Sequence, residues 1–424
     1  MTLWRPMRDR LARAFFGNFF RLLLLTVSLA QWSVLWWLFP NEIGSRAWAW
    51  QVVGVGLFFG GNRWLVMRTQ RHRRQRSPSG VLPRFYYACA FTCLFCFTFL
   101  LLTGALWMGA RVMLGAIAVE ARTAHAGMVI DSDIDVVFRW LANSGMAVIA
   151  IAFGYGYTIG QRRLRVTRLS LPLRGLPPAL SGLRIAQISD LHIGDNLDRA
   201  QLETFVARIN ALRADVVCIT GDIIDAPSSD MQSFLPILAG VRAAHGVFAI
   251  LGNHDHYADA DRVQHALQTL TPFTVLRDQS AVLQVHGTRL HIVGVDDRGR
   301  DWARGVTQHP YLAGALAAVP EGEAVLLLSH RPDLFPQAAA AGVSLMLSGH
   351  THGGQIAVPW FNGRLRNLAE FITPYDRGLF ERQGSFLYVN CGLGVTGQRI
   401  RLFTPREITV IEAQVPSVPA GAAA

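Results

Sequence analysis

The sequence contains no lysine, so all 40 of its basic residues are arginines. It is also poor in cysteine, with five in 424 residues. Three of these, Cys89, Cys93 and Cys96, share one apolar segment, which leaves too few elsewhere to suggest a disulfide framework. Their spacing places three thiols on one helix face, where packing between helices is favoured over a soft-metal or redox site.

Acidic residues are scarce in the first part of the chain. Residues 1–168 hold 20 arginines and 6 acidic residues, whereas residues 169–424 hold 20 arginines and 23 acidic residues. The net charge of +11 therefore comes from the first part, and the second part is mildly acidic. Because nucleic-acid affinity depends on clustered positive charge, nucleic acid is not an expected partner of the second part.

Four segments in the first 160 residues are long and apolar enough to cross a bilayer, which requires about 20 such residues. We expect spans at about 22–40, 47–67, 85–110 and 140–160. Buried helices of a soluble domain are a weaker interpretation of four segments of this length. A signal peptide is not expected, because the first segment lacks a small-residue cleavage pattern and three more spans follow it.

The arginines form three clusters that flank these segments. They precede the first span, separate the second from the third, and follow the fourth, whereas the loops at 41–46 and 111–139 carry no such excess. With four alternating helices, all three clusters lie on the cytoplasmic side, together with the N-terminus and the C-terminal domain. The cluster at 68–76 is interpreted as a topological anchor that contacts membrane lipids. A specific lipid or nucleic-acid site is the alternative.

The sequence pattern changes after the fourth span, where the long apolar segments end. We expect a basic and proline-rich linker at 161–181, an α/β domain at 182–412 and a short tail at 413–424. Helices are predicted over residues 199–213 and about 229–243, between three short apolar strands. This βαβαβ order predicts parallel strands whose carboxyl ends meet at one edge of the sheet.

The strands expected between 281 and 413, the last of them EITVIEA, are predicted to form a second sheet packed against the first. A longer excursion at 353–380 interrupts them, and Asn362-Gly363 within it predicts a hairpin turn. Trp360 and Phe361, near the tip of that hairpin, either cover a substrate or pack on the sheet.

Seven oxygen- and nitrogen-bearing side chains follow the predicted strand ends. They are Asp190, His192, Asp222, Asn253, His330, His350 and His352. Open α/β sheets bind ligands at this edge, and hydrolysis of a phosphoester can use two metal ions about 3.5–4 Å apart. Asp222, at the middle strand, is the natural bridging ligand.

The other six ligands divide into two sets around that bridge. Asp190, His192 and His352 would complete one metal, and Asn253, His330 and His350 the other. This mixture of nitrogen and oxygen donors suits two divalent ions of Mn, Fe, Zn or Co better than Mg.

Five motifs give the chain a resemblance to calcineurin-like metallophosphoesterases. They are DLH at 190–192, GDIID at 221–225, GNHD at 252–255, the lone His330, and GHTH at 349–352. The resemblance covers about 182–412 and implies a four-layer αββα sandwich of two mixed sheets, here preceded by a bundle of four transmembrane helices. It implies the same ligands, with His254 facing the phosphate as proton donor or transition-state stabiliser and Asp255 orienting it.

The stretches HTHGGQ and SHRPD resemble a membrane-associated bacterial branch of the family, often described as phosphodiesterases. That resemblance implies a bacterial inner membrane. The favoured function is a membrane-tethered phosphohydrolase that uses metal-activated hydroxide on a phosphodiester or phosphomonoester. The expected substrate is lipid-linked or nucleotide-type, at the cytoplasmic leaflet.

Two alternatives belong to other functional classes. A nuclease of the same family is disfavoured by the acidic balance of the second part, and a catalytically silent membrane sensor or scaffold by the complete ligand set with His254. Asp225 is expected to support a ligand or to cap a helix, and Asp296 and Asp297 are candidates for the rim of the site. His256 and His291 are not expected in the site.

Overall fold

The computed structural model describes residues 4–40, 48–74, 80–120, 124–285, 287–297, 309–360 and 362–416. Phe361 and residues 417–424 of the expected tail lie outside this description. The chain divides into two compact units, Met1–Tyr155 and Gly156–Ala424, called here the first and the second unit.

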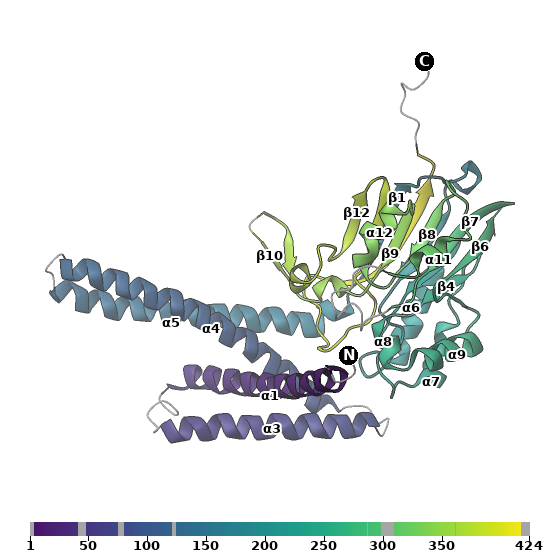
Figure 1. Ribbon diagram of the computed structural model, residues 1–424. Helices are drawn as coiled ribbons and strands as arrows, with labels where there is room; N and C mark the ends of the chain where they lie inside the picture. Colours follow the sequence, from purple (N-terminus) through teal and green to yellow (C-terminus); the bar gives the residue numbers. More distant parts are fainter. Residues whose placement is uncertain are drawn as a thin grey trace, which may run out of the picture. The chain divides into compact units, whose positions relative to one another are not determined.

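Four long helices make up the described part of the first unit (Figure 1). They are α1 (Trp4–Leu38), α3 (Trp48–Arg74), α4 (Val81–Glu120) and α5 (Ala124–Thr158), whose last turn belongs to the second unit. Each covers one of the four expected spans, and α1 packs against both α3 and α4. The expected bundle of four helices is therefore present.

Three segments in the described helices are long and apolar enough to cross a membrane. They are Phe19–Leu38, Val81–Leu114 and Asp135–Arg162, which match the first, third and fourth expected spans. By length and composition alone α3 is not among them, because Gln51, Asn62 and Arg63 interrupt its apolar residues. The expectation of four spans thus reduces to three by this measure.

One polar residue of α3, Asn62, is nevertheless turned inward. Asn62 is only 3% exposed and donates to Ser28 Oγ at 2.9 Å and to Gln31 Oε1 at 2.8 Å. The hydroxyl of Tyr86 on α4 donates to Asn62 Oδ1 at 3.0 Å. Because every polar group of the Asn62 amide has a partner, its burial between three helices carries little cost.

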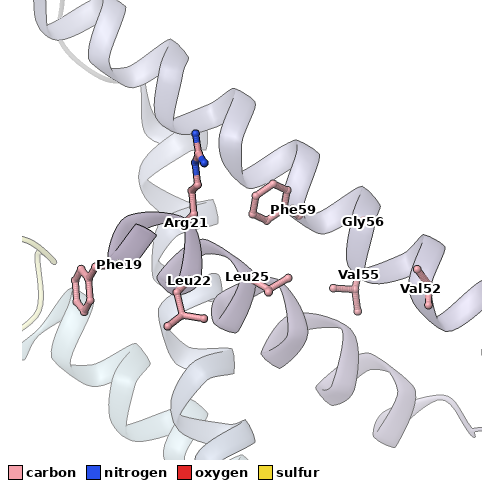
Figure 2. A pocket seen from close by; sticks show the side chains of 8 residues that line it. All are labelled: Phe19, Arg21, Leu22, Leu25, Val52, Val55, Gly56 and Phe59. Atoms are coloured by element: carbon pink, nitrogen blue, oxygen red, sulfur yellow. The ribbon is translucent and has the colours of Figure 1, made fainter. Parts of the chain in front are cut away.

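The outward face of α3 is apolar. Val52, Leu57 and Trp64 are all more than half exposed. A groove between α1 and α3 has a volume of about 760 Å³, and Arg21 is the one charged residue among the eight that line it (Figure 2). The helix therefore has the Asn62 amide inside and large apolar side chains outside, unlike a helix on the surface of a soluble domain.

The first sheet of the second unit contains six strands. In spatial order they are β1 (Leu164–Pro172), β14 (Arg406–Gln414), β2 (Arg184–Ile188), β3 (Val216–Thr220), β4 (Val247–Ile250) and β5 (Thr274–Val275). As the βαβαβ order predicts, β2, β3 and β4 are parallel. Two features differ from expectation: β1 forms within the segment expected to be a linker, and β14 joins this sheet instead of the second.

The second sheet also contains six strands. In spatial order they are β12 (Gly378–Arg382), β13 (Ser385–Val389), β9 (Leu345–Ser348), β8 (Val325–Leu328), β7 (Thr288–Gly294) and β6 (Gln279–Val285). The central pairs are parallel and both edge pairs are antiparallel, so the sheet is mixed. The expected hairpin forms from β10 (Ala357–Pro359) and β11 (Leu365–Asn367), outside both sheets (Figure 1).

Helices cover the outer faces of the two sheets. Apolar residues of α6 (Arg199–Ala211), α7 (Met231–Leu238) and α9 (Ala260–Leu270) share a core with the first sheet, and α11 (Leu312–Leu316) and α12 (Phe335–Ala340) with the second. Between the sheets, side chains such as Val216 and Ile250 pack with Leu326 and Leu347. The predicted four-layer αββα architecture of two mixed sheets is confirmed.

Candidate metal centre

The predicted ligands follow five strands at one edge of this sandwich. Asp190 and His192 come after β2, Asp222 after β3, Asn253 after β4, His330 after β8, and His350 and His352 after β9. Asp190, His192, Asp222, His350 and His352 all have φ between 48° and 71°, the left-handed region that is unfavourable for residues other than glycine. Such strain persists only where the surroundings hold the backbone, and it is commonest at functional sites.

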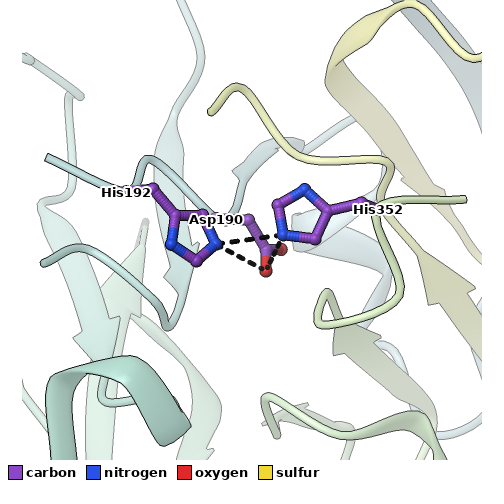
Figure 3. A group of neighbouring side chains, drawn as sticks. All are labelled: Asp190, His192 and His352. Carbon is purple, nitrogen blue, oxygen red and sulfur yellow. Dashed lines mark hydrogen bonds and ion pairs between the residues drawn. The ribbon is translucent and has the colours of Figure 1, made fainter. Parts of the chain in front are cut away.

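Asp190, His192 and His352 form one group (Figure 3). Nε2 of His192 lies 3.0 Å from Nε2 of His352. The Oδ1 atom of Asp190 lies 3.4 Å from the same Nε2 atom of His352. All three side chains are buried, and their ligand atoms can hold one ion together. Donors bound at 2.0–2.1 Å around one tetrahedral ion are about 3.3 Å apart, so these separations fit a shared cation.

Asp222, His330 and His350 form a second group. Oδ2 of Asp222 lies 3.3 Å from Nε2 of His330, which in turn lies 3.2 Å from Nδ1 of His350. The same Oδ2 atom lies 3.6 Å from Nε2 of His192 in the first group. The two groups therefore meet at Asp222.

Asn253 is the one predicted ligand outside these two groups. It begins α8 (Asn253–Tyr257) and is only 6% exposed. Within the residues that the structure describes, its buried Oδ1 atom accepts no hydrogen bond. A buried carbonyl oxygen without a donor costs about 1–3 kcal/mol unless something else satisfies it, and a cation would do so.

Further contacts fix which ring nitrogen of each histidine faces the centre. His192 donates from Nδ1 to Oδ1 of Asp225 at 3.2 Å, and His330 donates from Nδ1 to the carbonyl of Thr220 at 2.8 Å. In both rings the Nε2 lone pair is left for the centre. This arrangement is typical of metal-binding histidines.

The Asp225 carboxylate also contacts His254. Nδ1 of His254 lies 3.4 Å from Oδ1 of Asp225 and 3.1 Å from its carbonyl oxygen. The expectation that Asp255 orients this ring is wrong, because the Asp255 carboxylate accepts the backbone N–H groups of Gly252, Ile223 and Ile224. Asp255 braces the two loops, and Asp225 holds the histidine.

The charges in the centre shift the pKa of several groups. Burial alone would raise the pKa of Asp222, but His330, His192 and His254 hold it well below its usual range. Burial likewise lowers the pKa of His330, yet Asp222 and Asp190 outweigh it and raise that pKa to about 10. The pKa of His254 rises to about 9 in the same way, against the effect of burial, through Asp225 and Asp222. The carboxylates thus favour positive charge on His330 and His254.

Two glycines allow the loops to approach the carboxylates closely. A Cβ atom at Gly252 would collide with Oδ1 of Asp222, and one at Gly349 with Oδ2 of Asp190. Neither position has a positive φ, so close approach and not backbone conformation requires the glycine. This explains the glycines of the GNHD and GHTH motifs.

Two arginines of the site were not predicted. Arg331 contacts Nε2 of His350 through Nη1 at 2.8 Å and donates from Nε to Oδ2 of Asp297 at 2.9 Å. Arg401 is fully buried and donates to the carbonyls of Cys391, Gly392 and Gly394, with Nη2 3.5 Å from Nδ1 of His352. The place of Arg331 directly after His330 was a usable signal, whereas nothing local marks Arg401.

The remaining candidates lie at the margin. Asp296 pairs with His256 at 2.8 Å and with Arg277, and His291 pairs with Glu323 at 2.6 Å. As expected, neither histidine belongs to the groups that could hold a metal ion. Asp297 reaches the centre only through Arg331.

Comparison with known proteins gives three kinds of similarity. The sequence profile of the family described as calcineurin-like phosphoesterase matches residues 183–354. The chain is 32% identical over 267 residues to the metallophosphoesterase YkuE of Bacillus subtilis, which covers 61% of this chain and 88% of the relative. It is 28% identical over 339 residues to a transmembrane protein with metallophosphoesterase domain of Danio rerio. That alignment covers 78% of this chain and 74% of the relative. A solved dimetal phosphatase of Danio rerio aligns with a TM-score of 0.33 and 13% identity over 50% of this chain and 88% of its own, too low to carry an argument.

Proposed function

The chain belongs to the calcineurin-like metallophosphoesterase family and is a hydrolase of phosphoesters, and we propose that its seven clustered side chains hold two divalent metal ions. The observation that carries this proposal is the position of Asp222, whose Oδ2 atom lies within 3.6 Å of a histidine nitrogen from each group. A carboxylate in that place can bridge two ions. The unsatisfied Oδ1 atom of Asn253 provides independent support.

The donor set determines which ions fit and what they supply. Four imidazoles, two carboxylates and an amide favour Mn, Fe, Zn or Co. When bound, such a pair supplies a hydroxide nucleophile at neutral pH and offsets the charge of the phosphoryl oxygens. The chain's own contribution is to fix the rings of His192 and His330, which donate hydrogen bonds to Asp225 and to the carbonyl of Thr220.

His254 is the proposed proton donor. Its backbone N–H donates to Oδ1 of Asp222 at 2.8 Å, which anchors the residue beside the proposed bridge. Asp225 favours the protonated ring, whose Nε2 can then deliver a proton to the leaving oxygen or stabilise the transition state. In this assignment His254 acts on the substrate and does not bind metal.

The side of the membrane that this centre faces depends on α3. We propose that α3 crosses the bilayer, which makes four spans and leaves both the N-terminus and the second unit in the cytoplasm of a bacterium. The burial of Asn62 and the exposure of Leu57 suit a helix surrounded by lipid. With α3 crossing, the arginine-rich segment 68–76 also lies in the cytoplasm, as the positive-inside rule favours.

The proposed substrate is a lipid-linked or nucleotide-type phosphoester at the cytoplasmic leaflet. The membrane helices keep the centre near lipids, and the relative from Danio rerio shares this combination by name. The excess of acidic residues in 169–424 argues against DNA or RNA.

A substrate panel tests the proposed reaction. Purified full-length protein with Mn²⁺ would be assayed against a chromogenic phosphodiester, nucleotide-lipids, phospholipids, cyclic nucleotides and DNA. We expect turnover of a lipid-linked or nucleotide-type member, its loss in His330→Gln, and its retention in the matched control His256→Gln. Preference for DNA, or equal turnover by the two variants, would contradict the proposal.

Reporter fusions test the topology. A reporter after Ala424 should show cytoplasmic activity, and one inserted at 41–46 should show periplasmic activity. A periplasmic signal after Ala424 would mean that α3 does not cross.

A further inference from the structure

A cluster of apolar side chains is exposed on the excursion that contains β10 and β11. Its members are Val358, Trp360, Leu368, Phe371, Ile372 and Leu379, called here the apolar lobe. Phe371 is 88% exposed and its neighbour Ile372 is 65% exposed. Adjacent large apolar residues exposed to this extent are unusual on a water-facing surface, and such patches mark interaction sites.

The exposure is built into the local structure. Phe371 ends the short helix η5 (Leu368–Phe371), which a capping box fixes at its start. The Asn367 side chain accepts the N–H of Ala369 at 2.8 Å, and Glu370 accepts the N–H of Asn367 at 3.1 Å. The lobe is therefore held in an ordered, outward-facing conformation.

The segment that carries the lobe is bonded to the loop between two of the proposed metal ligands. Thr351, between His350 and His352, donates to the carbonyl of Asp376 at 2.5 Å. Asn367 donates to the Asp376 carboxylate at 2.7 Å. The base of the lobe is therefore attached to the loop that carries His350 and His352.

The base of the lobe is also joined to the end of the last candidate span. Within the second unit, Arg401 N–H donates to the carbonyl of Gly156 in the last turn of α5 at 3.2 Å. The next residue, Leu402, exchanges backbone hydrogen bonds of 2.9 Å with Gln355 and Ala357 at the start of the hairpin. The candidate span Asp135–Arg162 ends two residues before β1 begins, so the chain enters this corner directly from that span.

Arginines flank the apolar side chains. Arg364, Arg366 and Arg377 line a hollow of about 530 Å³ beside the lobe, together with two acidic residues, Glu370 and Asp376. Arg366 pairs with Glu370 and Arg377 pairs with Asp376, so the net charge of the hollow is one positive unit, which favours an anionic lipid headgroup. Apolar side chains with tryptophan and arginine at their border are typical of surfaces that insert into the membrane interface.

We propose that the apolar lobe inserts into the bilayer surface from which α5 emerges, with the arginines on anionic headgroups. The insertion is a second attachment of the catalytic unit, in addition to the helices. As a consequence, which rests on the proposed function, a lipid-linked phosphoester can reach the metal centre without leaving the membrane.

Photo-crosslinking in vesicles tests the insertion directly. Full-length protein carrying a photo-reactive phenylalanine analogue at Phe371 would be reconstituted in phosphatidylcholine and phosphatidylglycerol vesicles and irradiated. We expect lipid adducts at position 371 and none at the control position Val282, which is 51% exposed on β6 at the far edge of the second sheet. Adducts at 371 to the protein's own helices or to a second copy, or a lipid yield no higher than at 282, would overturn the proposal.

A kinetic comparison tests the consequence separately. In the double variant Phe371→Ser/Ile372→Ser, turnover of a vesicle-held substrate should fall by roughly tenfold or more while turnover of a soluble substrate is unchanged, because the second attachment is lost. Equal loss on both substrates would overturn the delivery role. Because crosslinking does not require turnover, failure of the proposed reaction would leave the insertion test intact.

Discussion

The carboxylate of Asp225 accepts a hydrogen bond from Nδ1 of His192 at 3.2 Å and lies 3.4 Å from Nδ1 of His254. One side chain thus orients both a proposed metal ligand and the proposed proton donor. The two histidine rings meet edge to face, with centroids 4.6 Å apart. The loop after β3 therefore links the proposed metal ligand to the proposed proton donor.

Replacement of Asp225 should weaken both functions. Asp225→Asn keeps the shape but removes the negative charge, and contacts of this kind change metal affinity or activity by about 10–100-fold. Metal titration and turnover of the purified variant would measure this. Asp261→Asn, at a carboxylate that is 92% exposed, is the matched control and should behave as wild type. Equal metal affinity and equal turnover in the two variants would contradict the orienting role of Asp225.

His254→Gln should separate chemistry from metal binding. We expect bound metal close to the wild-type amount, with turnover reduced by about 10²–10⁴-fold, the usual contribution of a general acid or base. Elemental analysis and steady-state kinetics on the same preparation would provide both values. Loss of metal from this variant would make His254 a ligand.

Glu407 should contribute stability that depends on pH. This buried carboxylate accepts hydrogen bonds from Arg165, Thr167, Tyr388 and the N–H of Cys391, so it joins β1 and β14 to the second sheet. Burial would raise its pKa, but Arg165 and these donors lower it.

The sign of the pH dependence follows from that lowered pKa. The stabilisation is present above the unfolded value of about 4.3 and is lost as the pH falls through the folded value. Glu407→Gln should cost about 1–3 kcal/mol at neutral pH. Thermal unfolding in detergent at several pH values should show the variant and wild type converging as the pH falls. A difference that stays constant down to pH 3 would contradict this role.

Asn62→Ala should destabilise the first unit. It removes the partner of Ser28, Gln31 and Tyr86 between three helices, and hydrogen bonds between membrane helices contribute about 1 kcal/mol. Leu57→Ala, at a side chain that is 72% exposed, is the control and should have little effect. Thermal unfolding in lipid nanodiscs would compare them. An equal loss from both would mean that the network does not hold α3.

The sequence predicted best those parts of the fold that depend on nearby residues. The parallel order of β2, β3 and β4 follows from short βαβ connections, and all the predicted ligands lie at the ends of strands. By contrast, β14 pairs with β1 and β2 from far along the chain, and its run of buried residues carries no sign of which sheet it joins.

Contacts between distant parts of the chain also explain why some residues of the site were missed. Arg401 reaches His352 only because the loop after β13 folds over the centre, and its carbonyl partners have no sequence signature. Asp225 and Asp255 are each the last residue of a motif, and only the geometry distinguishes the one that holds His254. For α3, composition alone does not reveal that Asn62 has hydrogen-bond partners on two other helices.

The metal content of Asp222→Asn tests the central claim most directly. Elemental analysis of the purified full-length protein, with folding checked by thermal unfolding, should give two metal ions per chain for wild type. It should give at most one for the folded variant, together with loss of phosphodiester turnover, because Asn lacks the second anionic oxygen needed to bridge. Two ions per chain and unchanged turnover in Asp222→Asn would contradict a dimetal centre shared through Asp222.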